Sequence, residues 1–415
     1  MWIEREIGNE LKKAAATFPV VALIGPRQAG KTSILERIFS TYRYVSLDVA
    51  ANAEAAETRP QEFLQRNPPP IIFDEIQYAP AFFRHIKTRV DSERGRNGLF
   101  IITGSQNFLL MENLAESLAG RAAVIPFLGL SATEWRATAG DRSPPDWKNF
   151  LWRGGFPALW SAPQAPPSRD RWYQGYVATY LERDVRNLLN VGSLRDFERF
   201  LRACAARCGQ ALNLSELGRD VGVSTPTAKQ WLSVLQASNQ VFLLEPYHRS
   251  LGKRISKTPK LYFTDGGLAA YLVGFASADA LWSSREAGAF WENHVVCQWL
   301  RWRDWHEPSL GLWYWRDQGG NEVDLILERD RKLVAVECKL KEKPQEKDIQ
   351  GIRKLKKFYG QDEVAKSYVD IPTDSSFDVE PGITAVSGWE VWPLEARPGP
   401  AKEWQNGVRP SLMKA

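Results

Sequence analysis

Short apolar runs alternate with segments of helical periodicity over the first 130 positions of the chain. Such runs predict strands that are buried on both faces, as in a parallel sheet. The predicted strands are Val20–Ile24, Tyr44–Asp48, Pro70–Asp74, Gly98–Thr103 and Ala122–Phe127. The predicted helices are Ile3–Thr17, Lys31–Phe39, the alanine- and glutamate-rich segment 49–67, and Ala81–Asp91. Strands that alternate with helices predict an α/β domain over residues 1–130, with a doubly covered parallel sheet.

Helical periodicity dominates the next part of the chain. Residues 131–190 predict a helical lid on the first domain. Leu214–Val221 and Thr225–Gln236 predict two short helices joined by a tight turn, which is the spacing of a helix-turn-helix. Val241–Tyr247 then predicts a wing strand. We therefore expect a winged-helix domain with a connector over residues 191–279.

The last third of the chain returns to short apolar runs. Val323–Glu328 and Leu333–Cys338 predict two strands joined by a short charged turn, and Glu286–Leu300 predicts a helix before them. We expect a second α/β domain over residues 280–395, followed by an irregular tail at 396–415.

The turn after the first strand carries a phosphate-binding motif. It fits G-x-x-x-x-G-K-[ST] between a strand and a helix, which defines a P-loop. Its glycines permit backbone angles closed to other residues, so successive N–H groups converge on a phosphate. We expect Lys31 to reach the β- and γ-phosphates of ATP, and the hydroxyl of Thr32 to bind Mg²⁺. The predicted nucleotide-binding residues of this loop are Gly25, Pro26, Arg27, Gln28, Ala29, Gly30, Lys31, Thr32 and Ser33.

Polar residues follow two further strands of the predicted sheet. In P-loop ATPases the first acid after such a strand holds Mg²⁺, and the second polarises the attacking water. We assign these roles to Asp74 and Glu75. Thr103, Ser105 or Gln106 is a candidate sensor of the γ-phosphate, and Ser105 is included in the predicted nucleotide site; a polar turn after a buried strand is the alternative.

Arg121 precedes the last predicted strand of the first domain. It is a candidate arginine finger, a side chain that reaches the nucleotide of a neighbouring subunit. An ordinary surface arginine is the alternative.

Charge and composition restrict the partners and the compartment. The net charge of +5 permits a polyanionic partner. The four cysteines lack the spacing of a metal site, so reduced thiols are expected. The sequence shows neither a basic-then-apolar leader nor a run of about 18 apolar residues, and we therefore expect a cytoplasmic protein with no membrane span.

Basic residues follow the predicted wing strand. They are expected to contact DNA, because each neutralised phosphate releases condensed counterions. The lysine-rich segment 341–357 offers a second such surface. Alternatively, the winged helix serves only protein contacts or domain packing, and its positive loop is merely solvated. The basic residues after the wing are Arg249, Lys253, Arg254, Lys257 and Lys260.

Two carboxylates and a lysine gather in the predicted C-terminal hairpin. Asp324 lies in the first strand, and Glu337 and Lys339 point to one face of the second because they are two positions apart. This set suits metal-assisted phosphodiester hydrolysis, with Asp324 and Glu337 on Mg²⁺ and Lys339 orienting the water. Glu292, in the preceding helix, is a further candidate ligand. An ordinary charged hairpin is the alternative.

Several strings, in this order, resemble a family of prokaryotic AAA-superfamily ATPases whose C-terminal half is a domain of unknown function. The resemblance implies an AAA-type core and lid, a winged helix, and a C-terminal domain similar to the PD-(D/E)xK nucleases. In that nuclease superfamily the motif residues correspond here to Asp324, Glu337 and Lys339, with Glu292 as the helical acid. The matching strings are GPRQAGKTS (25–33), IIFDEIQ (71–77), ITGSQ (102–106), SLAGR (117–121), GGFP (154–157), YLERDV (180–185), KLYFTDGGL (260–268), EVDLI (322–326) and ECK (337–339).

Residues and resemblance together predict a Mg²⁺-dependent ATPase that acts on DNA and carries a nuclease-like domain. One alternative is a DNA motor or Holliday-junction-type remodeller whose C-terminal domain only holds DNA. Another is a signalling-type ATPase switch that binds protein partners through its winged helix. We also expect a homo-oligomer, and a ring is one arrangement of it.

Overall fold

The computed structural model describes residues 2–105, 116–139, 146–161, 168–181, 194–248 and 258–392. The candidate sensor Gln106, the basic residues from Arg249 to Lys257, most of the YLERDV string and the tail lie outside these ranges. Within the described ranges, no helix is long and apolar enough to cross a lipid bilayer.

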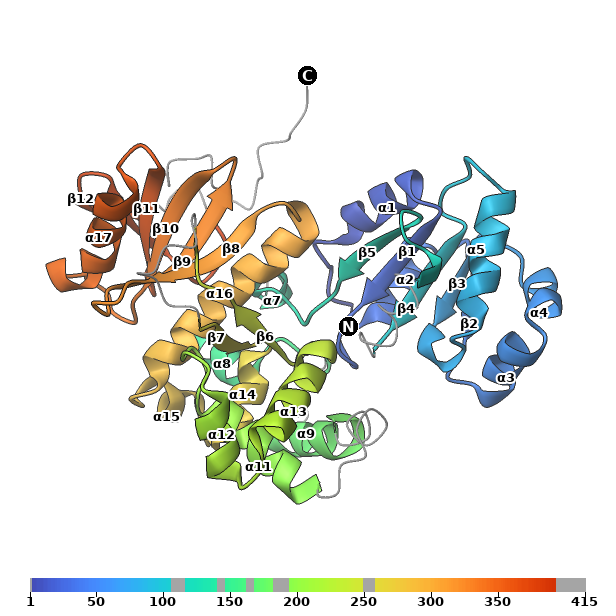
Figure 1. The fold of residues 1–415 in the computed structure, drawn as a ribbon, viewed down its shortest axis with the longest axis horizontal. Helices are drawn as coiled ribbons and strands as arrows, with labels where there is room; N and C mark the ends of the chain where they lie inside the picture. Colours follow the sequence, from blue (N-terminus) through green and yellow to red (C-terminus); the bar gives the residue numbers. More distant parts are fainter. Residues whose placement is uncertain are drawn as a thin grey trace.

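The N-terminal domain is built on a five-stranded parallel sheet (Figure 1). Its strand order is β2-β3-β4-β1-β5, so the strand before the P-loop is flanked on both sides. All five predicted strands are present, with ends within two residues of the prediction, and the predicted parallel α/β core is confirmed. The strands are β1 (Val20–Ile24), β2 (Arg43–Ser46), β3 (Ile71–Asp74), β4 (Phe100–Gly104) and β5 (Ala122–Pro126).

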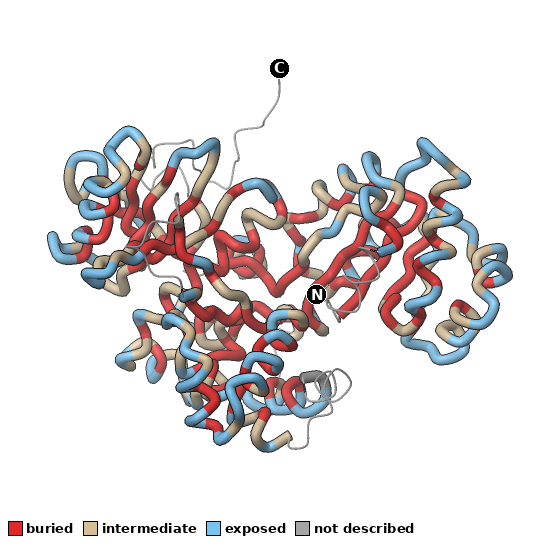
Figure 2. Tube along the Cα trace, viewed as in Figure 1, coloured by how far each residue is buried: buried red, intermediate tan, exposed pale blue. Residues whose placement is uncertain are grey.

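Alternate residues of β1 face opposite layers of helices, as the two-residue repeat of a strand requires. Val21 and Leu23 pack with α1 and α2, whereas Val20 and Ala22 pack in the core that contains α4 and α5. Both layers are buried, which explains the unbroken apolar run (Figure 2). The helices are α1 (Gly8–Thr17), α2 (Lys31–Ile38), α3 (Ala50–Thr58), α4 (Pro60–Arg66) and α5 (Phe82–Ser92), with a 3₁₀ turn η1 (Ile76–Tyr78).

A helical module follows, in which the predicted lid and the predicted winged helix share one hydrophobic core. Its helices are α7 (Ala132–Ala139), α8 (Trp147–Arg153), η3 (Pro157–Leu159), α9 (Arg169–Tyr176), η4 (Val177–Leu181), α11 (Leu194–Ala205), α12 (Leu214–Val221), α13 (Thr225–Ala237), α14 (Gly266–Val273) and α15 (Ala278–Trp282). Its only strands among the described residues form an antiparallel hairpin, β6 (Val241–Leu244) and β7 (Lys260–Phe263).

The hairpin strand β6 is shorter than the predicted wing strand, because the chain leaves the hairpin after Leu244. The N–H of Tyr247 donates to the carbonyl of Tyr314 at 2.6 Å, and the N–H of Tyr314 donates to the carbonyl of Glu245 at 3.1 Å. Residues 245–247 therefore tie the helical module to the C-terminal sheet through the backbone.

The C-terminal domain is a mixed six-stranded sheet with the order β12-β13-β11-β10-β9-β8. The predicted hairpin is present as β9 and β10, which pair antiparallel. The strands are β8 (Gly311–Arg316), β9 (Glu322–Arg329), β10 (Lys332–Cys338), β11 (Val364–Ile371), β12 (Phe377–Glu380) and β13 (Ile383–Ser387). The helices are α16 (Ala287–His306) and α17 (Gln350–Tyr359), with a 3₁₀ turn η5 (Glu346–Ile349).

Helix α16 lies at the centre of the molecule (Figure 1). Trp291 and Trp299 are buried in the core shared with the helical module. Trp305, near the other end of the helix, belongs to the core under α1 and α2, and its Nε1 donates to the carbonyl of Pro126 at 3.0 Å. One helix thus contacts all three parts of the chain.

Candidate active sites

The P-loop has the backbone that its sequence predicts. A Cβ on Gly25 would lie 1.8 Å from the carbonyl oxygen of Phe127, so a side chain has no room at this position. Gly30 has φ +94°, in the left-handed region that favours glycine, and α2 begins at the next residue. The first N–H groups of α2 therefore point toward the space where a phosphate would bind.

Lys31 is folded over the loop and almost fully buried. Its Nζ donates to the carbonyl of Gly25 at 2.9 Å and to that of Pro26 at 3.0 Å. The ammonium group is therefore positioned directly above the turn, where phosphate oxygens can replace these carbonyls.

Asp74 connects the P-loop to two neighbouring strands. Its Oδ2 accepts from the hydroxyl of Thr32 at 2.8 Å and from the hydroxyl of Tyr44 at 2.6 Å, and its Oδ1 accepts from Thr103. Burial, together with the Asp74 carboxylate, raises the pKa of Tyr44 well above its ordinary value, so the phenol stays a donor. The two residues predicted to hold Mg²⁺, Thr32 and Asp74, are thus in direct contact.

Glu75 is held beside this pair by a second set of polar contacts. It has φ 56°, an unusual value for a residue with a side chain. Its Oε2 accepts from the hydroxyl of Ser105 at 2.9 Å and from Nε2 of Gln77 at 2.5 Å. Thr103 accepts from the backbone N–H of Glu75 at 3.0 Å. Ser105 is therefore the candidate sensor that contacts Glu75, whereas Thr103 contacts Asp74.

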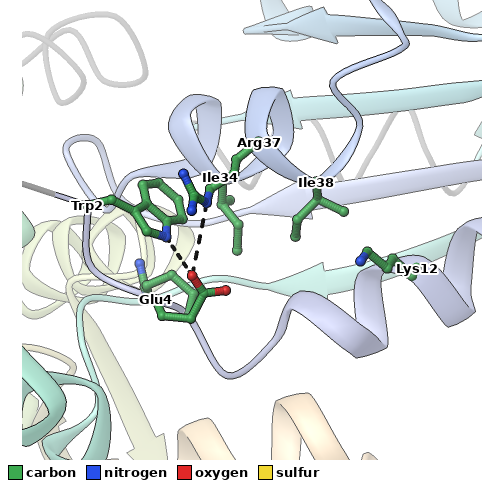
Figure 3. A pocket seen from close by; sticks show the side chains of 7 residues that line it. Trp2, Glu4, Lys12, Ile34, Arg37 and Ile38 are labelled. Atoms are coloured by element: carbon green, nitrogen blue, oxygen red, sulfur yellow. Dashed lines mark hydrogen bonds and ion pairs between the residues drawn. The ribbon is translucent and has the colours of Figure 1, made fainter.

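A cavity of about 420 Å³ opens over the P-loop, within the size range of small-molecule pockets. Two of its walls come from segments that the sequence analysis did not assign to the nucleotide site, Trp2–Arg5 and Pro157–Ser161. Beside it lies a smaller pocket of about 180 Å³, where Trp2 Nε1 donates to Glu4 at 2.8 Å and faces Arg37 of α2 (Figure 3). No motif connected these walls with nucleotide binding, since they reach the P-loop only through the fold.

Arg5 is the main support of the P-loop from outside the motif. It donates to the carbonyls of Ala29 at 3.0 Å and Leu128 at 2.9 Å, and its Nε lies 3.0 Å from Oε2 of Glu134. Its guanidinium is 4.1 Å from the ring centroid of Phe127. Burial lowers the pKa of Arg5, against the opposing effect of Glu134.

Arg121 lies away from this cavity. It precedes β5, at the amino end of the sheet, whereas the P-loop follows the carboxyl end of β1. Its guanidinium pairs with Asp91, with Nε 2.7 Å from Oδ1. Arg121 therefore cannot contact the nucleotide of its own chain, and its action on a neighbouring subunit stays a prediction.

The C-terminal candidates lie close together. Oxygen atoms of Glu292, Glu322 and Asp324 are all within 4.8 Å of one another. Lys339 Nζ lies 2.8 Å from Glu337 Oε2 and 3.1 Å from Asp324 Oδ2. Asp324 also accepts from the backbone N–H of Cys338 at 2.8 Å.

Glu322 was missed by the sequence analysis, which predicted Glu337 as the metal ligand beside Asp324. Glu322 is two positions before Asp324 in β9, so the same strand alternation that paired Glu337 with Lys339 identifies it. Glu337 is buried against α17, since a Cβ on Gly351 would lie 2.5 Å from its Oε1. The group of three carboxylates near enough to share a cation thus contains Glu322 in place of Glu337.

The structure shows that Lys260 is not part of the predicted basic surface. Counted among the DNA-facing residues, it is only 4% exposed and enters the carboxylate group. Its Nζ lies 2.7 Å from Glu292 Oε1 and 3.8 Å from Asp324 Oδ1, and it pairs with Glu322. Lys260 is the first residue of β7, a strand whose four residues are all buried.

Burial and mutual contact shift the ionisation of this cluster. Burial raises the pKa of Glu292 to about 7 and raises that of Glu337 well above its ordinary value. Burial also opposes the charge on Asp324, but Lys339 and Lys260 outweigh it and lower the pKa of that carboxyl. Both lysines therefore face ionised carboxylate and stay protonated.

The predicted helix-turn-helix has regular ends and an exposed polar face. Asn213 caps α12 and Ser224 caps α13, each accepting a backbone N–H three residues ahead. Lys229, Gln230 and Ser233 lie exposed on α13, while Trp231, Leu232 and Leu235 are buried beneath. The winged-helix identity of this module stays a prediction.

The first 135 residues define the class of this protein. Residues 17–135 match a family described as an AAA domain, and this region holds the P-loop, Asp74 and Glu75. This part of the chain is an AAA-type P-loop ATPase domain. Residues 144–279 and 287–395 match two domains of unknown function, DUF8612 and DUF4143.

Two curated relatives show the family to which the chain belongs. Uncharacterized protein Mb2031c of Mycobacterium bovis and uncharacterized protein Rv2008c of Mycobacterium tuberculosis are each 32% identical over 342 residues, which is 82% of this chain and 74% of theirs. The chain belongs to the family of these proteins.

Solved structures show a weaker likeness. The Walker-type ATPase PABY2304 of Pyrococcus abyssi is 17% identical with a TM-score of 0.46, covering 65% of this chain and 96% of that one. AMPPCP-bound DnaA of Aquifex aeolicus is 12% identical with a TM-score of 0.30, covering 55% and 85%. Neither likeness carries an argument about the sites.

Proposed function

We propose that this ATPase hydrolyses ATP with Mg²⁺ in the cavity over the P-loop and uses the cycle to act on DNA. The observation that carries the proposal is the 2.8 Å contact between Thr32 and Asp74, with Glu75 held beside it. A hydroxyl and a carboxylate in contact at the end of the P-loop are the oxygen donors that Mg²⁺ takes in such sites.

Each side chain has a role that its position supports. Lys31 exchanges the carbonyls of Gly25 and Pro26 for phosphate oxygens of ATP. Thr32 and Asp74 hold Mg²⁺, which neutralises phosphate charge when bound. Glu75 orients and polarises the attacking water, and Ser105 fixes the carboxylate that does so.

The test of ATP hydrolysis uses two variants with matched controls. Lys31→Ala should lose ATP binding, measured by titration with a fluorescent ATP analogue. Glu75→Gln should bind ATP but release phosphate about 10²–10⁴-fold more slowly, the usual loss on removing a general base. Lys13→Ala and Glu54→Gln, which change exposed residues of α1 and α3, should behave as wild type. Wild-type turnover in either site variant would refute the assignment.

DNA is the proposed substrate of the cycle because the helix-turn-helix presents an exposed polar face and the chain carries a net charge of +5. DNA should stimulate phosphate release and bind with strong salt dependence. In anisotropy titrations, Lys229→Ala should weaken binding to all sequences and reduce the salt slope by about 0.9, the loss of one phosphate contact. Absence of DNA retention at low salt would instead favour the signalling-type switch that binds proteins.

The C-terminal sheet is proposed as a nuclease-like domain that holds DNA. Lys260 pairs with Glu292, Glu322 and Asp324, and this pairing favours a DNA motor or remodeller over a nuclease that cleaves DNA. A cleavage assay decides between them, with linear, single-stranded and branched DNA incubated with the protein and Mg²⁺ or Mn²⁺. Cutting that is lost in Asp324→Asn would establish a nuclease, and DNA-stimulated ATP turnover without cutting would establish a motor or remodeller.

We further propose that the protein works in the cytoplasm as a homo-oligomer, with a ring as one form. Arg121 would then leave Asp91 and reach a neighbouring nucleotide. Arg121→Ala should lower turnover of the oligomer but leave ATP affinity unchanged; a reduced affinity would argue for a local structural role.

A further inference from the structure

The resemblance to PD-(D/E)xK nucleases implies a divalent cation at the C-terminal carboxylates, and the residues present can be tested against it. Glu292, Glu322 and Asp324 offer carboxylate oxygens within 4.8 Å of one another, which is the spacing of ligands around one ion. The space among these oxygens, however, already contains the ammonium group of Lys260. A divalent cation cannot share that space with a protonated lysine.

Lys260 is built into this position by its surroundings. Its backbone pairs with Leu244 of β6 and bridges to Ala211, so strand β7 is fixed on both sides. Its Nζ lies 5.5 Å from the ring centroid of Tyr314. Two positions further along the strand, the hydroxyl of Tyr262 donates to Glu292 Oε1 at 2.5 Å.

Each carboxylate of the cluster contacts an ammonium group of the protein. On one side Lys260 contacts the three carboxylates, and on the other Lys339 contacts Asp324 and Glu337. Every carboxylate of the cluster therefore has an ammonium partner. Buried acids need such partners, and here two lysines from different parts of the chain supply them.

We propose that the ammonium of Lys260, and no divalent metal, is the resident cation of the carboxylate cluster formed by Glu292, Glu322 and Asp324. The lysine belongs to the hairpin of the helical module, while all three acids belong to the C-terminal domain. The ion pairs of the cluster thus connect the helical module to the C-terminal domain. The carboxylates accept a divalent cation only after the Lys260 side chain has moved out of the cluster. This inference does not depend on ATP hydrolysis.

The test measures metal binding in the full-length protein without nucleotide. All variants carry Asp74→Asn, which removes the carboxylate predicted to hold Mg²⁺ in the ATPase domain. Mn²⁺ is titrated and free Mn²⁺ is followed by electron paramagnetic resonance, with thermal melting as a second readout. Lys260→Met, which keeps the stem and removes the charge, should bind about one Mn²⁺ at least about tenfold more tightly than the parent and should melt higher with Mn²⁺.

Two further variants locate the effect. Adding Glu322→Gln to Lys260→Met should remove the gained ion. Lys341→Met is the matched control, because Lys341 pairs with Asp348 at 2.8 Å in the same domain as the three carboxylates and forms an ion pair with none of them. This control should gain no Mn²⁺. Lys260→Gln, which retains a hydrogen bond to Glu292, repeats the test if Lys260→Met does not fold.

The outcomes separate clearly. A gain of Mn²⁺ binding in the Lys260 variants alone supports the proposal. Mn²⁺ binding by the parent that Asp324→Asn abolishes overturns it, because the metal would then bind with the lysine in place. Failure of both folded Lys260 variants to gain an ion also overturns it, since the carboxylates would not form a cation site even without the lysine.

Discussion

Arg5 offers a quantitative test of how the nucleotide site is supported. Arg5→Met removes the guanidinium while keeping much of the stem volume. Glu134 is then left as a buried carboxylate, 2% exposed, with backbone donors from Glu6 at 2.8 Å and Ser131 at 2.9 Å. Removing one partner of a buried ion pair costs about 3–5 kcal/mol. The two remaining donors put the expected loss of unfolding free energy near the lower end, about 3 kcal/mol.

The measurement is urea unfolding of the N-terminal domain, and limited proteolysis at increasing urea concentration reports the unfolded fraction. Arg136→Met is the matched control, since Arg136 pairs with Glu390 at 2.8 Å but its side chain is 42% exposed. Pairs of that kind are worth less than about 1 kcal/mol. In addition, Arg5→Met should weaken ATP binding, because the carbonyl of Ala29 in the P-loop loses its donor.

A double variant shows which contact dominates. Arg5→Met combined with Glu134→Leu replaces both buried charges with apolar groups, which is often close to neutral. Recovery of most of the lost stability would identify the ion pair as the main contribution. If Arg5→Met cost no more than the Arg136→Met control, the support assigned to Arg5 would be refuted.

Two further predictions follow from buried groups. Burial raises the pKa of Asp370 from 3.8 to about 8. Between these two pH values the folded state holds a proton that the unfolded state has released. The free energy of unfolding therefore falls as pH rises from about 4 through 8, by up to about 1.4 kcal/mol per pH unit. Asp370→Asn keeps an acceptor for Trp392 and should match wild type at pH 4 but be more stable at pH 8 in urea unfolding; equal stability at both pH values would contradict this sign. Gly25→Ala should abolish binding of a fluorescent ATP analogue, because its Cβ meets the Phe127 carbonyl oxygen at 1.8 Å. Gly288→Ala in α16, where no atom lies within 4 Å of the added Cβ, should retain binding.

The parts of the molecule that the sequence predicted well are those whose signals are local. The P-loop lies between a strand and a helix, and the strand, β1, begins and ends at the predicted residues. Helix α12 also has its predicted bounds, because Asn213 caps its first turn and Gly222 ends it. The meeting of Thr32 with Asp74 was also predictable, since the carboxyl ends of parallel strands share one edge of the sheet.

The unpredicted features are contacts between distant positions. Lys260 follows a run of basic residues in the chain, so its neighbours in sequence suggested DNA, whereas its neighbours in space are acids from α16 and β9. Arg5 and Glu134 are separated by 129 positions, and no local pattern joins them. Glu322 is the exception, because the two-residue period of the strand was enough to group it with Asp324.

The length of helix α16 fixes the relative orientation of the two contacts that its opposite ends make. Trp305 contacts Pro126 of β5 in the P-loop domain, and Glu292 contacts Lys260 in the carboxylate cluster. The two side chains are about 20 Å apart along the helix at 1.5 Å per residue. One residue inserted between them would turn one end by about 100° relative to the other, so both contacts cannot survive a change of helix length that is not close to whole turns. The spacing of these two positions on α16 thus fixes the orientation of the nucleotide domain relative to the helical module that carries Lys260.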